Sequence, residues 1–229
     1  MYPMYIFILK YIIIYMVINM ITTIYLIRHS EPFNEYLKNN NSITNFLSSN
    51  KKMPLSVNGE KLAESISSNN EFSKLDVVFS SDYIRAISTA KYFILQKNLP
   101  FYIDKIFGER IHGCQTSLNE LPANFGKIQF KDKTFKFGNG ESQEEVRNRM
   151  YCGIQNILNN YRGKNIGIAT HSAATFFLLF KWCNFEYDET LKITFKNKII
   201  FDKDLKYCQT FKLLFDDEKL IDICDINLK

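Results

Sequence analysis

The sequence has no closely spaced pair of cysteines and no concentrated positive charge. Its five cysteines are far apart and form no Cys-x-x-Cys pair, so neither a disulfide framework nor a zinc site is indicated. The formal net charge is +5, yet no run is rich in lysine and arginine. Such runs follow a nucleic-acid backbone, so we expect no nucleic-acid partner. We interpret the cysteines as reduced, packed thiols and expect a cytoplasmic protein.

The chain also lacks an internal boundary. No stretch rich in glycine, serine or proline divides it, and no internal repeat is present. A length of 229 residues suits one α/β domain with a full hydrophobic core. We therefore expect a single domain over residues 22–229, preceded by an apolar extension over residues 1–21.

The N-terminal extension is almost wholly apolar over residues 5–21, interrupted only by Lys10 and Asn19. A signal peptide is disfavoured because a basic n-region and a small-residue cleavage site are both missing. A membrane anchor stays open, since the run approaches the ~20 apolar residues that span a bilayer. We favour a start of the working protein at Met20, because a buried strand beginning by about Ile24 leaves little room for an adjacent spanning helix.

Hydrophobic periodicity predicts strands that alternate with helices. Short apolar runs predict strands at residues 24–27, 76–79, 100–103 and 166–169, and helices at about 57–67, 83–96, 143–158 and 173–182. Residues 39–49 and 105–140 are irregular, and the second stretch predicts an insert over the site. Further β-type runs follow residue 191. This order predicts an α/β fold: a three-layer α/β/α arrangement with a mostly parallel central sheet, helices on both faces and antiparallel edge strands at the C-terminus.

Only three histidines are present, and two of them directly follow predicted strands. Arg28 and His29 come after the first strand, and His171 comes after the strand at 166–169. Because open α/β sheets bind ligands at the carboxyl ends of their strands, we expect these side chains to meet. Neutral imidazole is a nucleophile near pH 7, and guanidinium binds phosphate oxygens. The pairing predicts a site that attacks phosphorus.

Five short motifs stand on the predicted elements. They read Arg28-His29-Ser30-Glu31, Pro54-Leu55-Ser56-Val57-Asn58-Gly59, Ser81-Asp82-Tyr83-Ile84-Arg85-Ala86-Ile87-Ser88-Thr89-Ala90, Gly140-Glu141-Ser142 and His171-Ser172. In this order, from about Thr23 to Phe180, they resemble the motifs of the histidine phosphatase superfamily, also called phosphoglycerate-mutase-like.

The resemblance implies a nucleophile and a set of phosphate ligands. His29 would attack phosphorus and become a phosphohistidine. Arg28, Arg85 and His171 would bind the phosphoryl oxygens and stabilise their charge in the transition state. All four residues are therefore expected to be catalytic.

The resemblance also implies a general acid, often found in a Glu-Arg-x-x-Gly context. The run from Glu109 to Gly113 has that form. Glu109 would protonate the leaving alkoxide and later activate the water that hydrolyses the phosphohistidine. Glu141 is a fallback, although a charge near a helix N-terminus also explains it. Arg110 would contact substrate or pair with a carboxylate, and His112 would lie at the surface or touch substrate.

Three positions depart from the family pattern. Ser30 and Ser172 replace the glycines that follow the two histidines, which costs strain if the backbone there needs positive φ. Their hydroxyls would instead donate to phosphate. The family's asparagine seven residues after the first arginine is Glu35 here, and Asn34 stands one residue early. We expect Ser30, Asn34, Arg110 and Ser172 to bind substrate.

These residues predict a metal-independent phosphatase that hydrolyses small phosphomonoesters through a phosphohistidine. No cofactor is expected, because we find no clustered carboxylates to hold a metal. A phosphoglycerate mutase stays open, since residues 105–140 would then exclude water. A non-catalytic phosphate-binding module stays open as well. A homo-oligomer is not excluded, and a membrane partner is expected only if residues 1–21 form an anchor.

Overall fold

The computed structural model describes residues 21–38, 45–95, 97–187 and 191–226. The predicted N-terminal extension lies outside this range except for Ile21, which begins the first strand. Among the described residues, none of the helices combines the length and hydropathy that crossing a bilayer requires.

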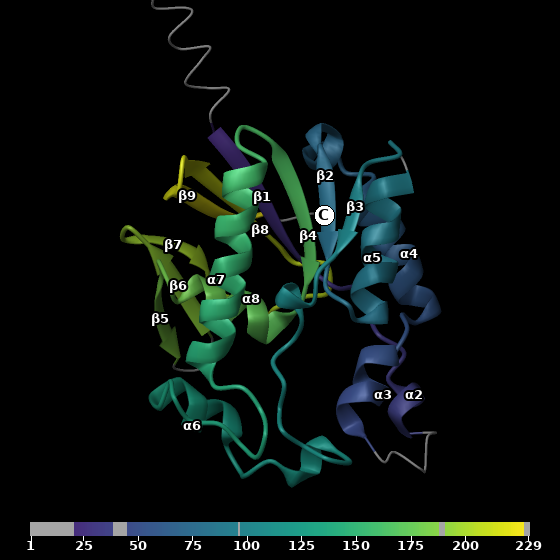
Figure 1. Ribbon diagram of the computed structural model, residues 1–229, viewed down its shortest axis with the longest axis vertical. Coiled ribbons are helices and arrows are strands. Elements are labelled where there is room, and N and C mark those ends of the chain that lie inside the picture. The colour runs from purple at the N-terminus through teal and green to yellow at the C-terminus, as the bar shows by residue number, and fades with distance from the viewer. Residues whose placement is uncertain (1–20, 39–44, 96, 188–190, 227–229) are drawn as a thin grey trace, which may run out of the picture.

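A six-stranded sheet forms the centre of the molecule, with strand order β3-β2-β4-β1-β8-β9 (Figure 1). Its strands are β1 (Ile21–Arg28), β2 (Val77–Ser80), β3 (Phe101–Ile103), β4 (Asn165–Thr170), β8 (Thr210–Asp216) and β9 (Lys219–Ile226). β1, β2, β3 and β4 run parallel, and β8 is antiparallel to both of its neighbours. The predicted mostly parallel sheet with C-terminal antiparallel strands at its edge is confirmed.

Helices cover both faces of this sheet, as the strand sequences require. β1 is buried over six consecutive residues, 22–27, which is the pattern of a strand enclosed on both sides. One face packs against α7 (Gln143–Asn160) and α8 (Ser172–Leu179), with Ile24 and Leu26 in that core. The other packs against α5 (Ile84–Leu95), with Tyr25 and Ile27, and α4 (Val57–Ser67) lies against α5. The three-layer arrangement is confirmed (Figure 1).

The C-terminal region differs from the prediction in one respect. β5 (Asn184–Tyr187), β6 (Leu191–Phe195) and β7 (Lys198–Phe201) form a separate antiparallel sheet instead of joining the central one. Its apolar residues Ile193, Phe195 and Phe201 pack into the same core as α7 and α8. This small sheet therefore extends the helical layer on that face.

The predicted helix starts are confirmed by their caps. The Ser56 side chain accepts from Gly59 N–H at the start of α4. Ser142 and Glu145 form a capping box at the start of α7.

Two stretches predicted as irregular contain short helices. α3 (Phe46–Lys52) falls partly within the predicted 39–49 loop, of which residues 39–44 lie outside the described range. The 105–140 insert holds η2 (Lys105–Phe107), η3 (Leu118–Glu120) and α6 (Phe125–Lys131). Two further short helices are α2 (Glu35–Lys38) and η1 (Asn70–Lys74). Helices this short are set by tertiary packing, so periodicity gives little signal for them.

Gly59 of α4 packs closely against Ser30 and Glu31, which follow His29. A Cβ at this position would lie 2.1 Å from the carbonyl oxygen of Glu31, so only glycine permits this approach. The Ser30 hydroxyl donates to the Gly59 carbonyl at 2.7 Å, and Ser56 N–H donates to the Glu31 carbonyl at 2.9 Å. α4 thereby fixes the residues next to His29.

Candidate active site

His29 and His171 lie side by side where two parallel strands end. β1 and β4 are neighbours with Arg28 opposite Thr170, so the next residue of each strand reaches the same edge. The imidazole centroids are 5.1 Å apart, and the rings meet edge to face. His29 is 6 % exposed and His171 is fully buried. The meeting of the two predicted histidines at this edge is what the topology requires.

Arg85 joins the two imidazoles. Arg85 lies in the first turn of α5, and the residue is 4 % exposed. Its Nε donates to His29 Nε2 at 3.2 Å, and its Nη2 lies 3.4 Å from His171 Nδ1. Nη1 donates to the backbone carbonyl of Asn50 at 2.7 Å and to its side-chain oxygen at 3.2 Å. The guanidinium is thus held at the centre of the cluster.

The hydrogen bonds assign a tautomer to the His29 imidazole. His29 Nδ1–H donates to the Ser30 carbonyl at 2.7 Å, which leaves the lone pair on Nε2 facing Arg85. His171 Nε2 lies 2.8 Å from the Ser81 hydroxyl, while its Nδ1 faces Arg85. A phosphate placed between them would take the Arg85 N–H groups onto its oxygens and free His29 Nε2 for attack.

Burial and neighbouring cations keep both imidazoles neutral. Burial, and then the charges of Arg85 and Arg28, lower the pKa of His29 well below its ordinary value. Burial and Arg85 do the same to the pKa of His171. Both arginines remain charged although burial lowers the pKa of each, because a guanidinium does not deprotonate in proteins. Neutral imidazole is the form in which a histidine is a nucleophile.

We expect the stability of the protein to fall as the pH drops from 7 to 5. His29 and His171 have lowered pKa values, and burial lowers that of His112 to about 4. Below pH 6.5 the unfolded chain therefore binds more protons than the folded one, so the free energy of unfolding decreases with decreasing pH. Each histidine contributes up to about 1.4 kcal/mol per pH unit below its unfolded value.

Urea unfolding at pH 7, 6 and 5 measures this loss. The carboxylates with lowered pKa values, such as Glu120 at about 2, act below this window and do not confuse it. His112→Gln removes one of the three contributions and should flatten the dependence by about a third. A free energy of unfolding that is constant between pH 7 and 5 would contradict the neutral cluster.

Glu109 lies at the same edge as the histidines. Its carboxylate accepts from the N–H groups of Ala174 at 3.0 Å and Ala173 at 3.4 Å, in the first turn of α8 directly after His171. Its charge raises the pKa of Arg28 and of Arg85 against the effect of burial. The structure therefore brings the predicted acid to the predicted nucleophile and arginines.

Arg28 is held by the segment 202–209 between β7 and β8, which carries no motif. Its Nη1 donates to the Leu205 carbonyl at 2.7 Å, and its guanidinium lies 4.6 Å from the centroid of the Tyr207 ring. The same ring lies 6.3 Å from that of His29. Nε of Arg28 is buried with no hydrogen-bond partner among the described residues. It stays available to an anion beside His29.

Three further residues were predicted to bind substrate, and they differ in how close they lie to the buried cluster. The Ser30 hydroxyl donates to Gly59, and neither Ser30 nor Ser172 has positive φ, so neither serine is strained. Ser172 is the first residue of α8. Asn34 is exposed just before α2, and no hydrogen bond joins it to the buried cluster in the described part of the chain. Their contacts with substrate stay predictions.

Arg110 is built into the insert. Its guanidinium lies 4.9 Å from the Phe125 ring centroid and 5.4 Å from that of Phe177. Nη1 donates to Gln129, a fully buried residue of α6, and Nη2 lies 3.2 Å from His112 Nε2. Its Nε is buried without a partner among the described residues. The aromatic contacts orient Arg110 whether or not it also touches substrate.

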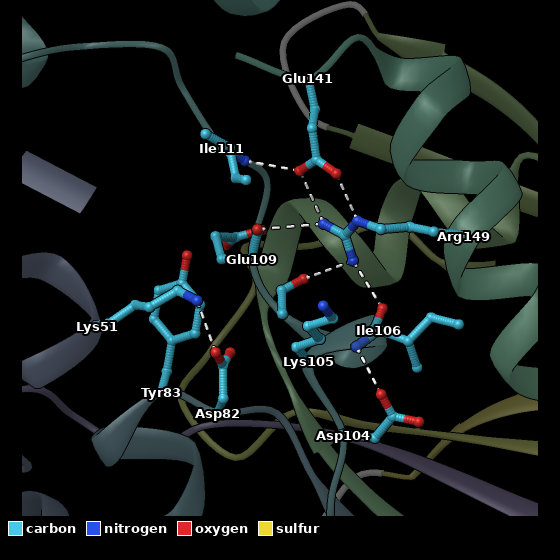
Figure 2. A pocket seen from close by; sticks show the side chains of 11 residues that line it. Lys51, Asp82, Tyr83, Asp104, Lys105, Ile106, Glu109, Ile111, Glu141 and Arg149 are labelled. Carbon is cyan, nitrogen blue, oxygen red and sulfur yellow. Dashed lines mark hydrogen bonds and ion pairs between the residues drawn. The ribbon is translucent and has the colours of Figure 1, made fainter. Parts of the chain in front are cut away.

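Glu141, the fallback acid, is held by an ion pair (Figure 2). Its two oxygens accept from Arg149 at 2.6 and 2.9 Å, and one also accepts from Ile111 N–H at 2.8 Å. Arg149 donates further to the carbonyls of Ile106, Gly108 and Glu109. The ion pair of Glu141 and Arg149 therefore fixes the irregular segment that carries Glu109. Within the described ranges, no group of three or more His, Cys, Asp or Glu side chains is arranged to hold a metal ion.

Sequence reasoning missed two supports of the cluster. Asn50 of α3 accepts two hydrogen bonds from Arg85, and Tyr207 packs against Arg28. For Asn50 a signal existed: Asn45 is a good N-cap, and Phe46 and Asn50 are one turn apart on one face. For Tyr207 we find none in the sequence.

Known proteins resemble this chain in sequence pattern and in fold. The description "Histidine phosphatase superfamily (branch 1)" belongs to a family model that matches residues 24–204. The chain is similar to the solved structure of a mycobacterial glucosyl-3-phosphoglycerate phosphatase, with a TM-score of 0.64 and 16 % identity over 90 % of this chain and 97 % of that one. A phosphoserine phosphatase variant from Entamoeba histolytica, solved with phosphoserine, gives 0.60 and 16 % over 88 % and 96 %. No curated protein sequence matches the chain.

Proposed function

The chain belongs to the histidine phosphatase superfamily, and from that membership we propose that it is a metal-independent phosphatase acting through a phosphohistidine on His29. The observation that carries the proposal is Arg85 lying between two buried, neutral imidazoles at the ends of adjacent strands. This arrangement supplies a nucleophile and a fixed cation within one phosphate's width of each other.

In the first step, His29 Nε2 forms a bond to phosphorus while the bond from phosphorus to the ester oxygen breaks. Nδ1–H stays on the Ser30 carbonyl and stabilises the positive ring. Arg28, Arg85 and His171 bind the three equatorial oxygens, where negative charge is spread in the transition state. Because these donors are already fixed by protein contacts, little reorganisation is needed during the reaction.

Glu109 handles the protons of both steps. It gives a proton to the departing alkoxide, which leaves as an alcohol. The resulting carboxylate then takes a proton from water, whose oxygen attacks phosphorus and breaks the bond to His29 Nε2. Inorganic phosphate is released and Glu109 is again protonated.

The substrate proposed for this site is a small phosphomonoester. The similar solved structures are named as phosphatases of glucosyl-3-phosphoglycerate and phosphoserine, both small esters. We propose no cofactor, no nucleic-acid partner and a cytoplasmic location, in line with the absence of paired cysteines and basic runs.

Hydrolysis of p-nitrophenyl phosphate by the full chain in the presence of EDTA tests the proposal. We expect equal amounts of p-nitrophenol and inorganic phosphate, at a rate that EDTA does not change. Loss of activity with EDTA, restored by a divalent metal, would contradict metal independence.

The same preparation tests the alternatives. Interconversion of 2- and 3-phosphoglycerate that outpaces phosphate release would identify a mutase. Phosphate binding in calorimetry without turnover of any ester would identify a binding module.

A further inference from the structure

Tyr83 and Glu109 line a pocket of about 380 Å³. Figure 2 shows the side chains that line it. Its wall is formed by residues of α3, the turn before α5, the η2 segment and α7. Tyr83 directly precedes α5, and its ring centroid lies 4.6 Å from that of His171 and 4.7 Å from the Arg85 guanidinium carbon. The pocket therefore shares a wall with the proposed phosphate site.

The hydroxyl of Tyr83 is an unsatisfied buried group. The residue is 1 % exposed, and its hydroxyl has no hydrogen-bond partner among the described residues. Leaving such a group unpaired costs about 1–3 kcal/mol. A phenylalanine would fill nearly the same volume without this cost, so the hydroxyl requires a hydrogen-bond partner that the unliganded chain does not provide.

Four of the charged side chains that line the pocket bind one another in two ion pairs. Lys51 donates to Asp82 at 2.6 Å, and Arg149 is bound to Glu141. Burial and the charge of Glu109 raise the pKa of Tyr83, so its phenol stays protonated at working pH and is a donor. Tyr83 and Glu109 both line this pocket, so the two groups lie near each other.

We infer that the alcohol half of the substrate occupies this pocket and that the Tyr83 hydroxyl donates a hydrogen bond to it, an inference that rests on the proposed function. Glu109 must reach the ester oxygen to protonate it, so the departing alcohol lies beside Glu109 and hence beside Tyr83. An oxygen on the carbon next to the ester carbon comes within reach of the phenol. The substrate class is therefore phosphomonoesters of small hydroxylated alcohols.

Two esters that differ only in such hydroxyls test this assignment. Glycerol 2-phosphate and isopropyl phosphate are both esters of a three-carbon secondary alcohol, and only the first has neighbouring hydroxyls. We expect Tyr83→Phe to lower the ratio of their kcat/KM values, glycerol 2-phosphate over isopropyl phosphate, about tenfold, which is one lost hydrogen bond. A merely structural role for Tyr83 would lower both constants together and leave the ratio unchanged.

Tyr92→Phe is the matched control, because the Tyr92 hydroxyl donates to Glu60 at 2.6 Å on α4, away from the pocket. Its ratio should equal that of the wild type. The melting temperature of unliganded Tyr83→Phe should be no lower than that of the wild type, since no internal hydrogen bond is lost. An unchanged ratio in Tyr83→Phe overturns the inference alone. A wild-type chain that hydrolyses neither ester overturns the proposed function as well.

Discussion

Replacing His29 by alanine is expected to lower phosphatase turnover by at least about four orders of magnitude, because the variant lacks the group that is proposed to form the bond to phosphorus. The remaining cations would still bind the ester, so KM should change far less than kcat. Arg85 loses its acceptor at His29 Nε2 but keeps both bonds to Asn50, which preserves the shape of the pocket. The measurement is steady-state hydrolysis of p-nitrophenyl phosphate at neutral pH.

A labelling experiment distinguishes a lost nucleophile from a damaged fold. The wild type, quenched during turnover of a radiolabelled ester, should carry label that is stable in alkali and released by acid, as a phosphohistidine is. The label should be absent from His29→Ala and present in His112→Gln, whose ring faces Arg110 and the insert. Label retained by His29→Ala would remove His29 from its proposed role.

Glu109→Gln is expected to lower kcat about 10²- to 10³-fold on alkyl phosphates, the usual contribution of a positioned acid or base. Glutamine keeps the size of the side chain and can still accept from Ala174 N–H, but it holds no transferable proton. With p-nitrophenyl phosphate the first step needs no acid, because p-nitrophenolate is a stable leaving group. Only the later hydrolysis of the phosphohistidine should then be slow.

Rapid-mixing kinetics read this difference directly. Glu109→Gln should release one equivalent of p-nitrophenolate in a burst, followed by slow turnover, and should show no burst of alcohol with glycerol 2-phosphate. Glu120→Gln is the control within the insert, since its carboxylate binds the exposed turn at Thr116. Equal losses on both esters without a burst would argue that Glu109 holds α8 in place and moves no proton.

Much of the fold was predictable because its central elements are long and regularly patterned. The continuous apolar run of β1 and the capping box of α7 predict a buried strand and a helix start, and both are confirmed. α3 and α6 were missed because seven residues give too little periodicity, and because their stability comes from buried contacts such as that of Gln129. The separate sheet of β5, β6 and β7 was missed since β-patterning does not specify which strand is the partner.

The centre of the candidate site follows from the sequence more directly than its surroundings. Histidines that end parallel strands must meet at one edge, so the approach of His29 and His171 needed no knowledge of side-chain packing. The contact of Arg85 with Asn50 spans 35 residues, and that of Arg28 with Leu205 spans 177. Such contacts depend on how loops lie in three dimensions, which no local pattern records. Ser30 shows the same limit, since its hydroxyl turns toward Gly59.

The position of β1 in the sheet determines when the sheet around it can be completed during synthesis. β1 is synthesised before every other described element, yet its two neighbours are β4 and β8, which come more than 130 residues later. Until β8 is made, one hydrogen-bonding edge of this apolar strand is open to other chains. The strand that presents His29 thus waits for the C-terminal hairpin, and contacts of such long range form slowly. A nascent chain that ends at β7 contains every residue assigned to the chemistry. One hydrogen-bonding edge of β1, the strand that leads to His29, is still unpaired at that point.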